Sequence, residues 1–284
     1  MKILKNRAVS FVFVFIVYLI AGASGVISYI FLPFDFWLNL LLADIIATAV
    51  TFIFSLIFRN ASVYDPYWSV QPVVIIIAFA ITAPALGPAQ ILPITAILIW
   101  GVRLTANWAY TFHGLTHQDW RYTMLKEQTG KIYPLVNFLG IHLVPTLIVY
   151  GCTLPAVFTL YYAPGFNAGS AVFFAVSILA VVLQGVADCQ MHAFRKKGKG
   201  GFIRNGVWKY SRHPNYLGEI LMWWGIALAF VCIMPEYWYL IAGAFANTLL
   251  FLFISIPMAD KHQARKEGFE EYRKATRMLL PIKK

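Results

Sequence analysis

Long apolar runs separated by short polar segments dominate the chain. Because a helix needs about 20 apolar residues to cross a bilayer core, the pattern predicts an all-α polytopic bundle of about eight spans, with seven as the alternative. The first run is too long for the h-region of a signal peptide and is kept as a helix. The predicted spans are 9–32, 37–58, 69–84, 89–111, 133–162, 168–193, 215–233 and 237–257.

The span over 133–162 is the least regular, because Pro145 and Pro155 can bend or break a helix. We treat residues 1–284 as a single integral-membrane domain. Within it, residues 184–284 form the part expected to bind a cofactor, and residues 258–284 are expected to form an interfacial tail helix.

Composition and charge agree with a membrane protein. The chain is 60% hydrophobic and only 12% charged, against about a quarter charged in soluble domains. The net charge of +11 would suggest nucleic acid in a soluble protein. With a cytoplasmic N-terminus, however, all 23 basic residues fall on the inner side or in an inner helix end, as the positive-inside rule requires. We therefore expect a multi-pass protein of the inner or plasma membrane if bacterial, with both termini cytoplasmic and no nucleic-acid partner.

The three cysteines lie far apart in apolar segments without CxxC spacing. This spacing argues against a metal site or a disulfide framework. No obligatory protein partner is evident in the sequence.

Polar residues in the N-terminal half offer candidates for substrate binding. Asp44 lies deep in a span, where an ionised carboxylate is costly, so it should be paired or protonated as a structural partner or as part of a site. Asp65, Tyr67, Trp68 and Gln71 follow at the start of the next span, where an aromatic interface belt is an equal alternative. We take Asp65 and Tyr67 as candidates to hydrogen-bond a carbonyl oxygen, and Trp68 as a candidate substrate contact.

Two helical faces carry polar residues at regular spacing. Arg103, Asn107 and Tyr110 follow i, i+4, i+7 spacing and either line a cavity or reach to headgroups. Four polar residues also share one face of a later span, and such a face is unlikely to be exposed to lipid because each group would lose its water. We expect this face to line a cavity open to the cytoplasm. Its members are Gln184, Asp188, His192 and Arg195.

A basic, glycine-rich loop follows this face. Glycines let backbone N–H groups approach an anion closely, and the basic side chains supply positive charge. The alternative is a polybasic loop drawn to anionic lipid headgroups, so membrane lipids are expected partners. The candidate phosphate ligands are Arg195, Lys197, Lys199, Arg204 and Arg212.

The stretch 206–219 joins this loop to an apolar helix. Pro214 suits a first helical turn, so the helix N-terminus directs its free N–H groups at the basic loop. Asn215, Glu219 and Trp223 then share one face at i, i+4, i+8 spacing. They suit recognition of a carboxamide, although a cap, a buried ion pair and an interface tryptophan would also explain them. In the tail, His262 and Arg265 could close over the loop.

These segments resemble the C-terminal region of the steroid 5α-reductase family, in particular its bacterial-type branch. The resemblance covers about a hundred C-terminal residues, including the 206–225 stretch and the 262–281 tail, and extends loosely to 65–68 and 100–103. It implies a polytopic reductase that transfers a hydride from NADPH to the C=C bond of a lipid enone. It also implies that Gln184, Asp188, Arg195, Asn215, Glu219 and His262 line the cofactor pocket.

Two departures limit the resemblance. The Gln-Glu pair that binds the substrate ketone in that family is absent, and Asp65 and Tyr67 could replace it. The block 212–218 also resembles S-adenosylmethionine-dependent membrane methyltransferases of the isoprenylcysteine and phospholipid type. Those enzymes usually carry paired glutamates at the start of the tail helix, where this chain has Ala259 and Asp260.

The sequence therefore predicts an NADPH-dependent oxidoreductase acting on the CH–CH group of a hydrophobic molecule that enters from the lipid phase. The cofactor site should face the cytoplasm, and neither a Rossmann fingerprint nor a P-loop is present. A methyltransferase and a non-catalytic lipid-binding protein are the alternatives. Asp65 and Tyr67 are the catalytic candidates, and Trp68 and Trp223 the substrate contacts. The cofactor candidates are Arg103, Asn107, Gln184, Asp188, Arg195, Lys197, Lys199, Arg204, Arg212, Asn215, Tyr216, Glu219, His262 and Arg265.

Overall fold

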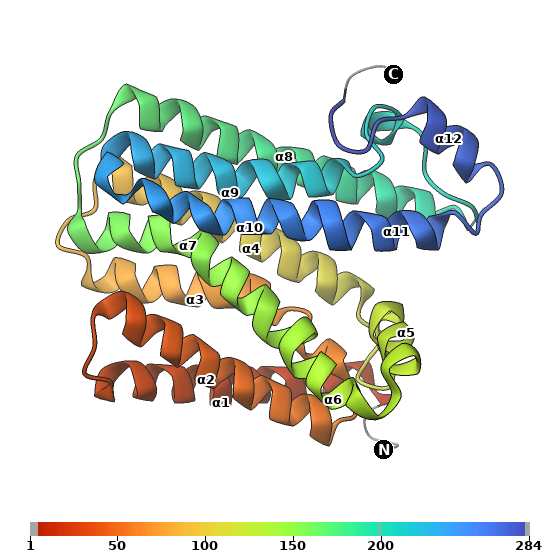
Figure 1. The fold of residues 1–284 in the computed structure, drawn as a ribbon, viewed down its shortest axis with the longest axis horizontal. Helices are drawn as coiled ribbons and strands as arrows, with labels where there is room; N and C mark the ends of the chain where they lie inside the picture. Colours follow the sequence, from red (N-terminus) through yellow and green to blue (C-terminus); the bar gives the residue numbers. More distant parts are fainter. Residues whose placement is uncertain (1–4, 199, 282–284) are drawn as a thin grey trace. The chain divides into compact units, whose positions relative to one another are not determined.

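A computed structural model of the chain describes residues 5–198 and 200–281, and within these ranges the regular structure is helical (Figure 1). In this described part of the chain, eight helical segments are long and apolar enough to cross a membrane, as the sequence predicts. The protein is therefore an integral, multi-pass membrane protein.

The long helices match the predicted spans closely, and shorter helical segments connect or extend them. The α-helices are α1 (Arg7–Phe31), α2 (Phe36–Ile57), α3 (Tyr67–Thr82), α4 (Pro88–Thr111), α5 (Trp120–Thr129), α6 (Tyr133–Val136), α7 (Val144–Tyr162), α8 (Ala168–Lys196), α9 (Pro214–Ile233), α10 (Ala242–Leu250), α11 (Ile256–Gln263) and α12 (Phe269–Ala275). The shorter elements are η2 (Ala61–Tyr64), η3 (Gly130–Ile132), η4 (Asn137–Leu143), η5 (Gly206–Lys209), η6 (Pro235–Ile241) and η7 (Phe251–Ser255).

The chain forms two compact units, each made of two segments. Unit 1 comprises residues 1–75 and 101–150, and unit 2 comprises residues 76–100 and 151–284. The helices α3, α4 and α7 each contribute one part to each unit. We describe the two units separately.

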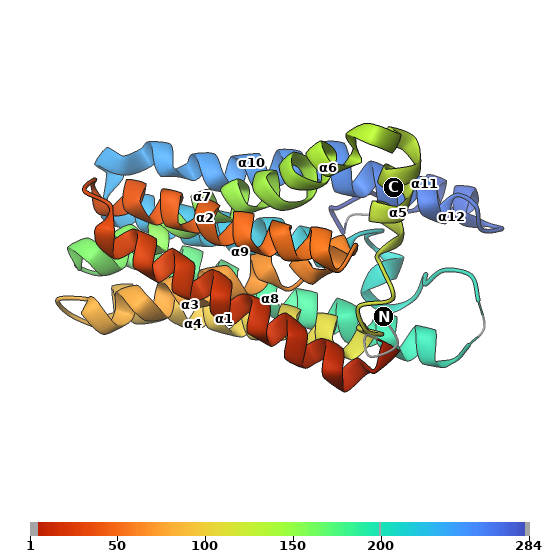
Figure 2. The same ribbon diagram turned by 90° about the horizontal axis from the view of Figure 1, so that it is seen from below.

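In unit 1, α1 and α2 pack as an antiparallel pair (Figure 2). Asn39 closes the connection between them, because its side chain accepts from the Phe34 N–H and donates to the Leu32 carbonyl. At the other end of α2, Asn60 donates to the carbonyls of Leu115 and His117. These contacts tie the start of η2 to the loop that follows α4.

The long span over 120–162 changes its helical geometry in the middle. Residues Asn137–Leu143 form a π-helix directly before Pro145 in α7. Proline has no N–H to donate to the carbonyl four residues earlier, so the preceding turn can widen into the longer-range pattern. The irregularity expected at the prolines is therefore a widened turn within one continuous span.

Unit 2 is built on close contact between α8 and α9, which lie side by side (Figure 1). A Cβ atom at Gly218 would lie 2.7 Å from the Ala180 carbonyl oxygen, and one at Gly225 would lie 2.7 Å from the Phe173 carbonyl oxygen. Only glycine allows the helices to approach this closely. The hydroxyl of Ser177 uses the proximity to donate to the Met222 carbonyl at 3.0 Å.

The tail differs from the single interfacial helix expected over 258–284. Helix α11 ends at Gln263, Gly268 adopts a φ of 75°, and beyond it, up to residue 281, only Phe269–Ala275 are helical. The left-handed glycine breaks the helix and turns the chain back. The tail then contacts the loop before α9, where the Arg212 N–H donates to the Arg277 carbonyl at 3.0 Å.

Candidate functional site

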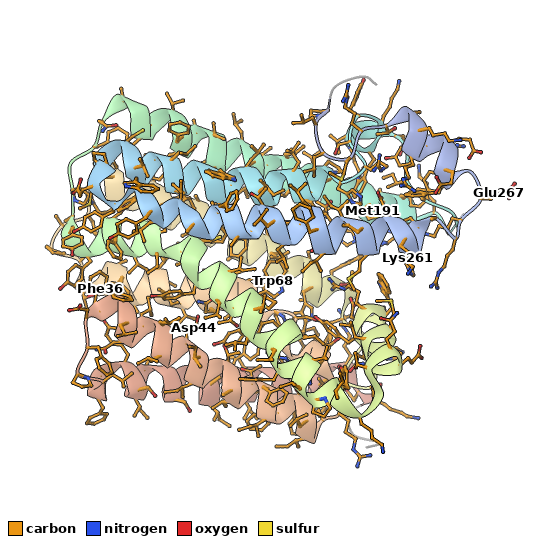
Figure 3. All side chains as sticks on the ribbon, in the orientation of Figure 1. Phe36, Asp44, Trp68, Met191, Lys261 and Glu267 are labelled. Carbon is orange, nitrogen blue, oxygen red and sulfur yellow. The ribbon has the colours of Figure 1, made fainter. Side chains whose placement is uncertain are left out.

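Unit 1 contains a buried polar network centred on Asp44 of α2. Both carboxylate oxygens accept a hydrogen bond, one from the Tyr67 hydroxyl at 3.0 Å and the other from the Gln71 amide at 2.7 Å. All three residues are at least nine-tenths buried. A carboxylate at this depth requires such partners. Figure 3 labels Asp44, together with Trp68, the neighbour of Tyr67 on α3.

Hydroxyl groups extend the network. The Tyr64 ring stacks on the Tyr67 ring, with centroids 5.3 Å apart, and its hydroxyl lies 2.8 Å from the Thr146 hydroxyl. Thr146 in turn lies 3.1 Å from the hydroxyl of Thr48. The network therefore joins α2, η2, α3 and α7 through groups that both donate and accept.

His142 lies beside this network in the π-helix. It is completely buried, its Nδ1 lies 3.0 Å from the Asn137 carbonyl, and its ring is 4.6 Å from that of Tyr64. Its Nε2 has no hydrogen-bond partner within the described residues. His142 was not predicted as a site residue, although a histidine inside an apolar run is a usable signal.

The two catalytic candidates belong to different hydrogen-bonding groups. Asp65 follows η2 and accepts from the Tyr122 hydroxyl of α5 at 2.6 Å, whereas Tyr67 pairs with Asp44. Trp68 is partly buried and packs on the cluster around Tyr64 and Tyr67. The structure thus pairs Tyr67 with an acid from α2, and Asp65 with the α5 segment.

The predicted cofactor residues are divided between the units. Arg103 and Asn107 lie in the part of α4 that belongs to unit 1, half-buried and engaged in other interactions. Of the other twelve candidates, eleven lie in the described part of unit 2 and Lys199 lies outside the described residues.

In unit 2, Glu219 of α9 is held by two tryptophans. Its carboxylate oxygens accept from the indole N–H of Trp100 at 2.8 Å and of Trp223 at 3.0 Å. The two tryptophans are fully buried and Glu219 is 5% exposed. Trp223 therefore helps to hold Glu219, and its indole N–H is occupied by that hydrogen bond. Trp100 was missed because it lies 119 residues from Glu219 in sequence.

The polar face of α8 runs from the interior toward the exposed end of that helix. Gln184 is 1% exposed and packs against Gly218 of α9. Asp188 and His192 are half-buried, with contacts of their own, and Arg195 is exposed. Solvent exposure therefore increases along the predicted face, from the buried amide of Gln184 to the exposed guanidinium of Arg195.

The basic loop after α8 concentrates positive charge. Arg195, Lys197 and Arg204 are exposed, whereas Lys199 lies outside the described residues. The Lys266 ammonium donates to the Gly201 carbonyl at 2.7 Å. Burial and the nearby Arg195 charge lower the pKa of Lys266. Such a loop has the charge and the donor groups to bind phosphate.

Arg212 has a structural role that the sequence did not reveal. Its guanidinium donates to the Asp260 carboxylate at 3.0 Å and to the Thr276 carbonyl at 2.5 Å. His213 Nε2 lies 2.9 Å from the other Asp260 oxygen. Arg212 thus fastens the tail to the start of α9. The tail could not be placed from its sequence, so the pairing with Asp260 was missed.

The remaining candidates surround the start of α9. Tyr216 stacks on His213 with centroids 5.2 Å apart, and Asn215 is half-buried beside it. His262 of α11 is half-buried with interactions of its own, while Arg265 is exposed in the turn that follows. Met191 and Lys261, labelled in Figure 3, mark α8 and α11 of this unit.

Comparisons with known proteins give the family. Residues 51–276 match the family described as "Protein of unknown function (DUF1295)". An uncharacterized protein of Schizosaccharomyces pombe is 25% identical over 193 residues, 58% of this chain and 56% of that protein. The 3-oxo-5-alpha-steroid 4-dehydrogenase 1 of Mus musculus is 33% identical over 112 residues, 38% of this chain and 40% of the enzyme.

The enzyme of that name from Bos taurus is 28% identical over 164 residues, 54% of this chain and 58% of the enzyme. In each of these matches the aligned region spans less than two thirds of the relative. The family match, by contrast, covers most of the chain. The chain therefore belongs to the DUF1295 family and is similar to the steroid 5α-reductases.

Proposed function

We propose that this protein is a membrane-embedded oxidoreductase that uses NADPH to reduce the C=C bond of a hydrophobic α,β-unsaturated carbonyl compound, steroid-like in size and polarity. The observation that carries the proposal is the buried Asp44–Tyr67–Gln71 network of unit 1. It provides an O–H donor in an apolar surrounding, which carbonyl chemistry of this kind requires.

The substrate carbonyl would accept a hydrogen bond from the Tyr67 hydroxyl. As a hydride adds to the β-carbon of an enone, negative charge builds on the carbonyl oxygen, and a fixed donor there stabilises the transition state. In this step the Asp44 carboxyl carries a proton and donates to the Tyr67 oxygen, so that the Tyr67 O–H is free to turn to the substrate. Gln71 holds the other Asp44 oxygen in place.

The reaction balances as one hydride and one proton added across the double bond. Bound NADPH would supply the hydride to the β-carbon. The enolate then takes a proton at the α-carbon, ultimately from water, and the carbonyl is restored. The Tyr67 hydroxyl keeps its own proton over the cycle.

Unit 2 offers groups suited to the cofactor. The exposed cations Arg195, Lys197 and Arg204 would bind the phosphates, and Lys266 reinforces their positive potential. Added Cβ atoms at Gly200 and Gly201 would meet nothing within 4 Å, so the loop backbone is open to an approaching anion. Asn215 would read the nicotinamide carboxamide.

The relatives support the chemistry. Similarity to proteins named 3-oxo-5-alpha-steroid 4-dehydrogenase 1 recurs in several mammals. We therefore favour the reductase over the methyltransferase. The Asp260 carboxylate is also already paired with Arg212 and His213, a contact that holds the tail.

Cofactor binding by the purified protein tests the proposal. We expect NADPH to raise the melting temperature, NADH to raise it less and S-adenosylmethionine to leave it unchanged. Asn215→Ala should weaken NADPH binding while retaining the melting temperature of the free protein. Stabilisation by S-adenosylmethionine alone would replace the reductase with a methyltransferase.

A further inference from the structure

A pocket lies in unit 1, at the end of α2 where the chain passes into η2. Its volume is about 310 Å³, space for roughly ten waters at about 30 Å³ each in the liquid. The helices α2, α5 and α6 and the turn between α5 and α6 line it. It is larger than a structural water needs, and the proposed reaction does not use it.

Three cations line this pocket: Arg59, Lys126 and Lys131. No ion pair joins any of them to a carboxylate within residues 5–198 and 200–281. Lys126 Nζ lies 5.9 Å from the centroid of the Tyr133 ring, which also lines the pocket. The pocket therefore concentrates positive charge and suits a phosphate group.

Two buried polar atoms in the lining lack partners. The Asn137 side chain is 2% exposed, and its amide donates to Ser55 Oγ at 3.2 Å, but its Oδ1 has no partner among the described residues. The same holds for the Tyr133 hydroxyl. A buried polar atom without a hydrogen-bond partner destabilises the fold. A ligand that carries a hydroxyl or another donor, in addition to its phosphate, would supply the missing hydrogen bond.

The backbone at the pocket is constrained as well. Arg59 adopts a φ of 54°, one of two positive values among the non-glycine residues described. Residues held in this region often belong to ligand-binding segments. The conformation directs the chain sharply from α2 into η2 and keeps Arg59 at the pocket.

The surface next to the pocket is apolar. Six aliphatic side chains near it in sequence are each more than 40% exposed, on α2 and on the segment around α6. They would lie against acyl chains in a membrane. A free nucleotide has no apolar chain to place on this surface. A phospholipid has both a phosphate for the cationic pocket and acyl chains for the apolar surface beside it. These residues are Ile53, Leu56, Ile57, Ile132, Leu135 and Leu139.

We propose that this pocket binds the headgroup of an anionic phospholipid whose phosphate is esterified to a polyol such as glycerol. The phosphate lies among Arg59, Lys126 and Lys131, a headgroup hydroxyl donates to Asn137 Oδ1, and the acyl chains follow the adjoining aliphatic surface. The bound lipid bridges α2 and the α5–α6 segment of unit 1.

Native mass spectrometry of the detergent-purified protein tests the site. The probes are phosphatidylglycerol, phosphatidic acid, phosphatidylcholine and free glycerol 1-phosphate. We expect one saturable phosphatidylglycerol per protein, weaker phosphatidic acid, and no retention of phosphatidylcholine or glycerol 1-phosphate. Equal binding of glycerol 1-phosphate would overturn the lipid assignment, and equal binding of phosphatidylcholine would overturn the role of the cations.

Two variants locate the binding. Lys126→Gln combined with Lys131→Gln changes only exposed side chains, and it should weaken phosphatidylglycerol about tenfold or more by removing two charges. The charge-matched control, Lys261→Gln combined with Lys274→Gln, should bind as the wild type does. If both pairs weaken binding equally, diffuse attraction explains the lipid and the pocket proposal fails.

A third variant tests the buried amide. Asn137→Leu should abolish the preference for phosphatidylglycerol over phosphatidic acid while phosphatidic acid still binds. Arg59→Asn keeps a residue that tolerates the left-handed conformation and should weaken both lipids. An unchanged lipid preference in Asn137→Leu, with the charge variants also unaffected, would contradict the assignment.

Discussion

At the scale of single residues, the pairing of Tyr67 with Asp44 is the feature that the sequence could not supply. The two lie 23 positions apart on different helices, and no spacing rule links them. The sequence instead suggested Asp65, which lies close to Tyr67 in the chain but accepts a hydrogen bond from Tyr122. Local motifs singled out Tyr67 as a candidate, whereas its hydrogen-bond partner depends on helix packing.

Removing the Tyr67 hydroxyl tests its proposed role. Tyr67→Phe keeps the ring stacked on Tyr64 but removes the donor, so kcat should fall about 100- to 1,000-fold, as for loss of one oxyanion donor. Steady-state kinetics in proteoliposomes would measure it. The matched control is Tyr64→Phe, whose hydroxyl bonds to Thr146. Equal losses in both variants would mean that the effect is structural.

At the scale of elements, the spans were predictable because apolar length is a strong signal, and their ends agree within a few residues over most of the chain. The tail was not. Its sequence suggested one interfacial helix, but Gly268 ends that regularity and Arg212 fastens the folded-back segment to α9. The contacts of Arg212 with Asp260 and Thr276 join residues 48 and 64 positions apart, so local pattern does not reveal them.

Glycine packing between α8 and α9 makes a sharp prediction. A methyl at Gly225 would meet the Phe173 carbonyl oxygen at 2.7 Å, and overpacking of this kind costs about 1–3 kcal/mol. Gly225→Ala should therefore lower the melting temperature. Gly22→Ala is the control, because nothing lies within 4 Å of its added Cβ. Equal melting temperatures for the two variants would refute the close approach.

The hydrogen bond that Tyr272 of the tail donates to the Trp208 carbonyl should break at high pH. Burial raises the pKa of Tyr272 from 10.0 to about 12, and its hydroxyl donates to the Trp208 carbonyl. The raised value means that this contribution to stability is complete below pH 10 and is lost as pH rises to about 12. Hydrogen exchange of residues 264–281 should increase over that window. In Tyr272→Phe the exchange should already be faster below it, and this part of the pH dependence should be absent.

At the scale of the whole molecule, the distribution of basic residues predicts the orientation in the membrane. Helix α8 separates the loop 163–167, which has no basic residue, from the basic loop 197–205. In a variant with all three native cysteines replaced by serine, Gly165→Cys should react with an impermeant maleimide in intact cells. Asn205→Cys should react only after permeabilisation. The reverse pattern would place the basic loop, and the proposed cofactor site, outside.

The central claim is hydride transfer from NADPH to a conjugated C=C bond, and isotope transfer measures it most directly. The wild-type protein in proteoliposomes is given NADPH deuterated at the transferable position and a steroid 4-en-3-one. We predict a saturated ketone with one deuterium at the β-carbon and a solvent proton at the α-carbon, formed far more slowly by Tyr67→Phe. A product without deuterium, or no turnover by a protein that binds NADPH, would contradict the account.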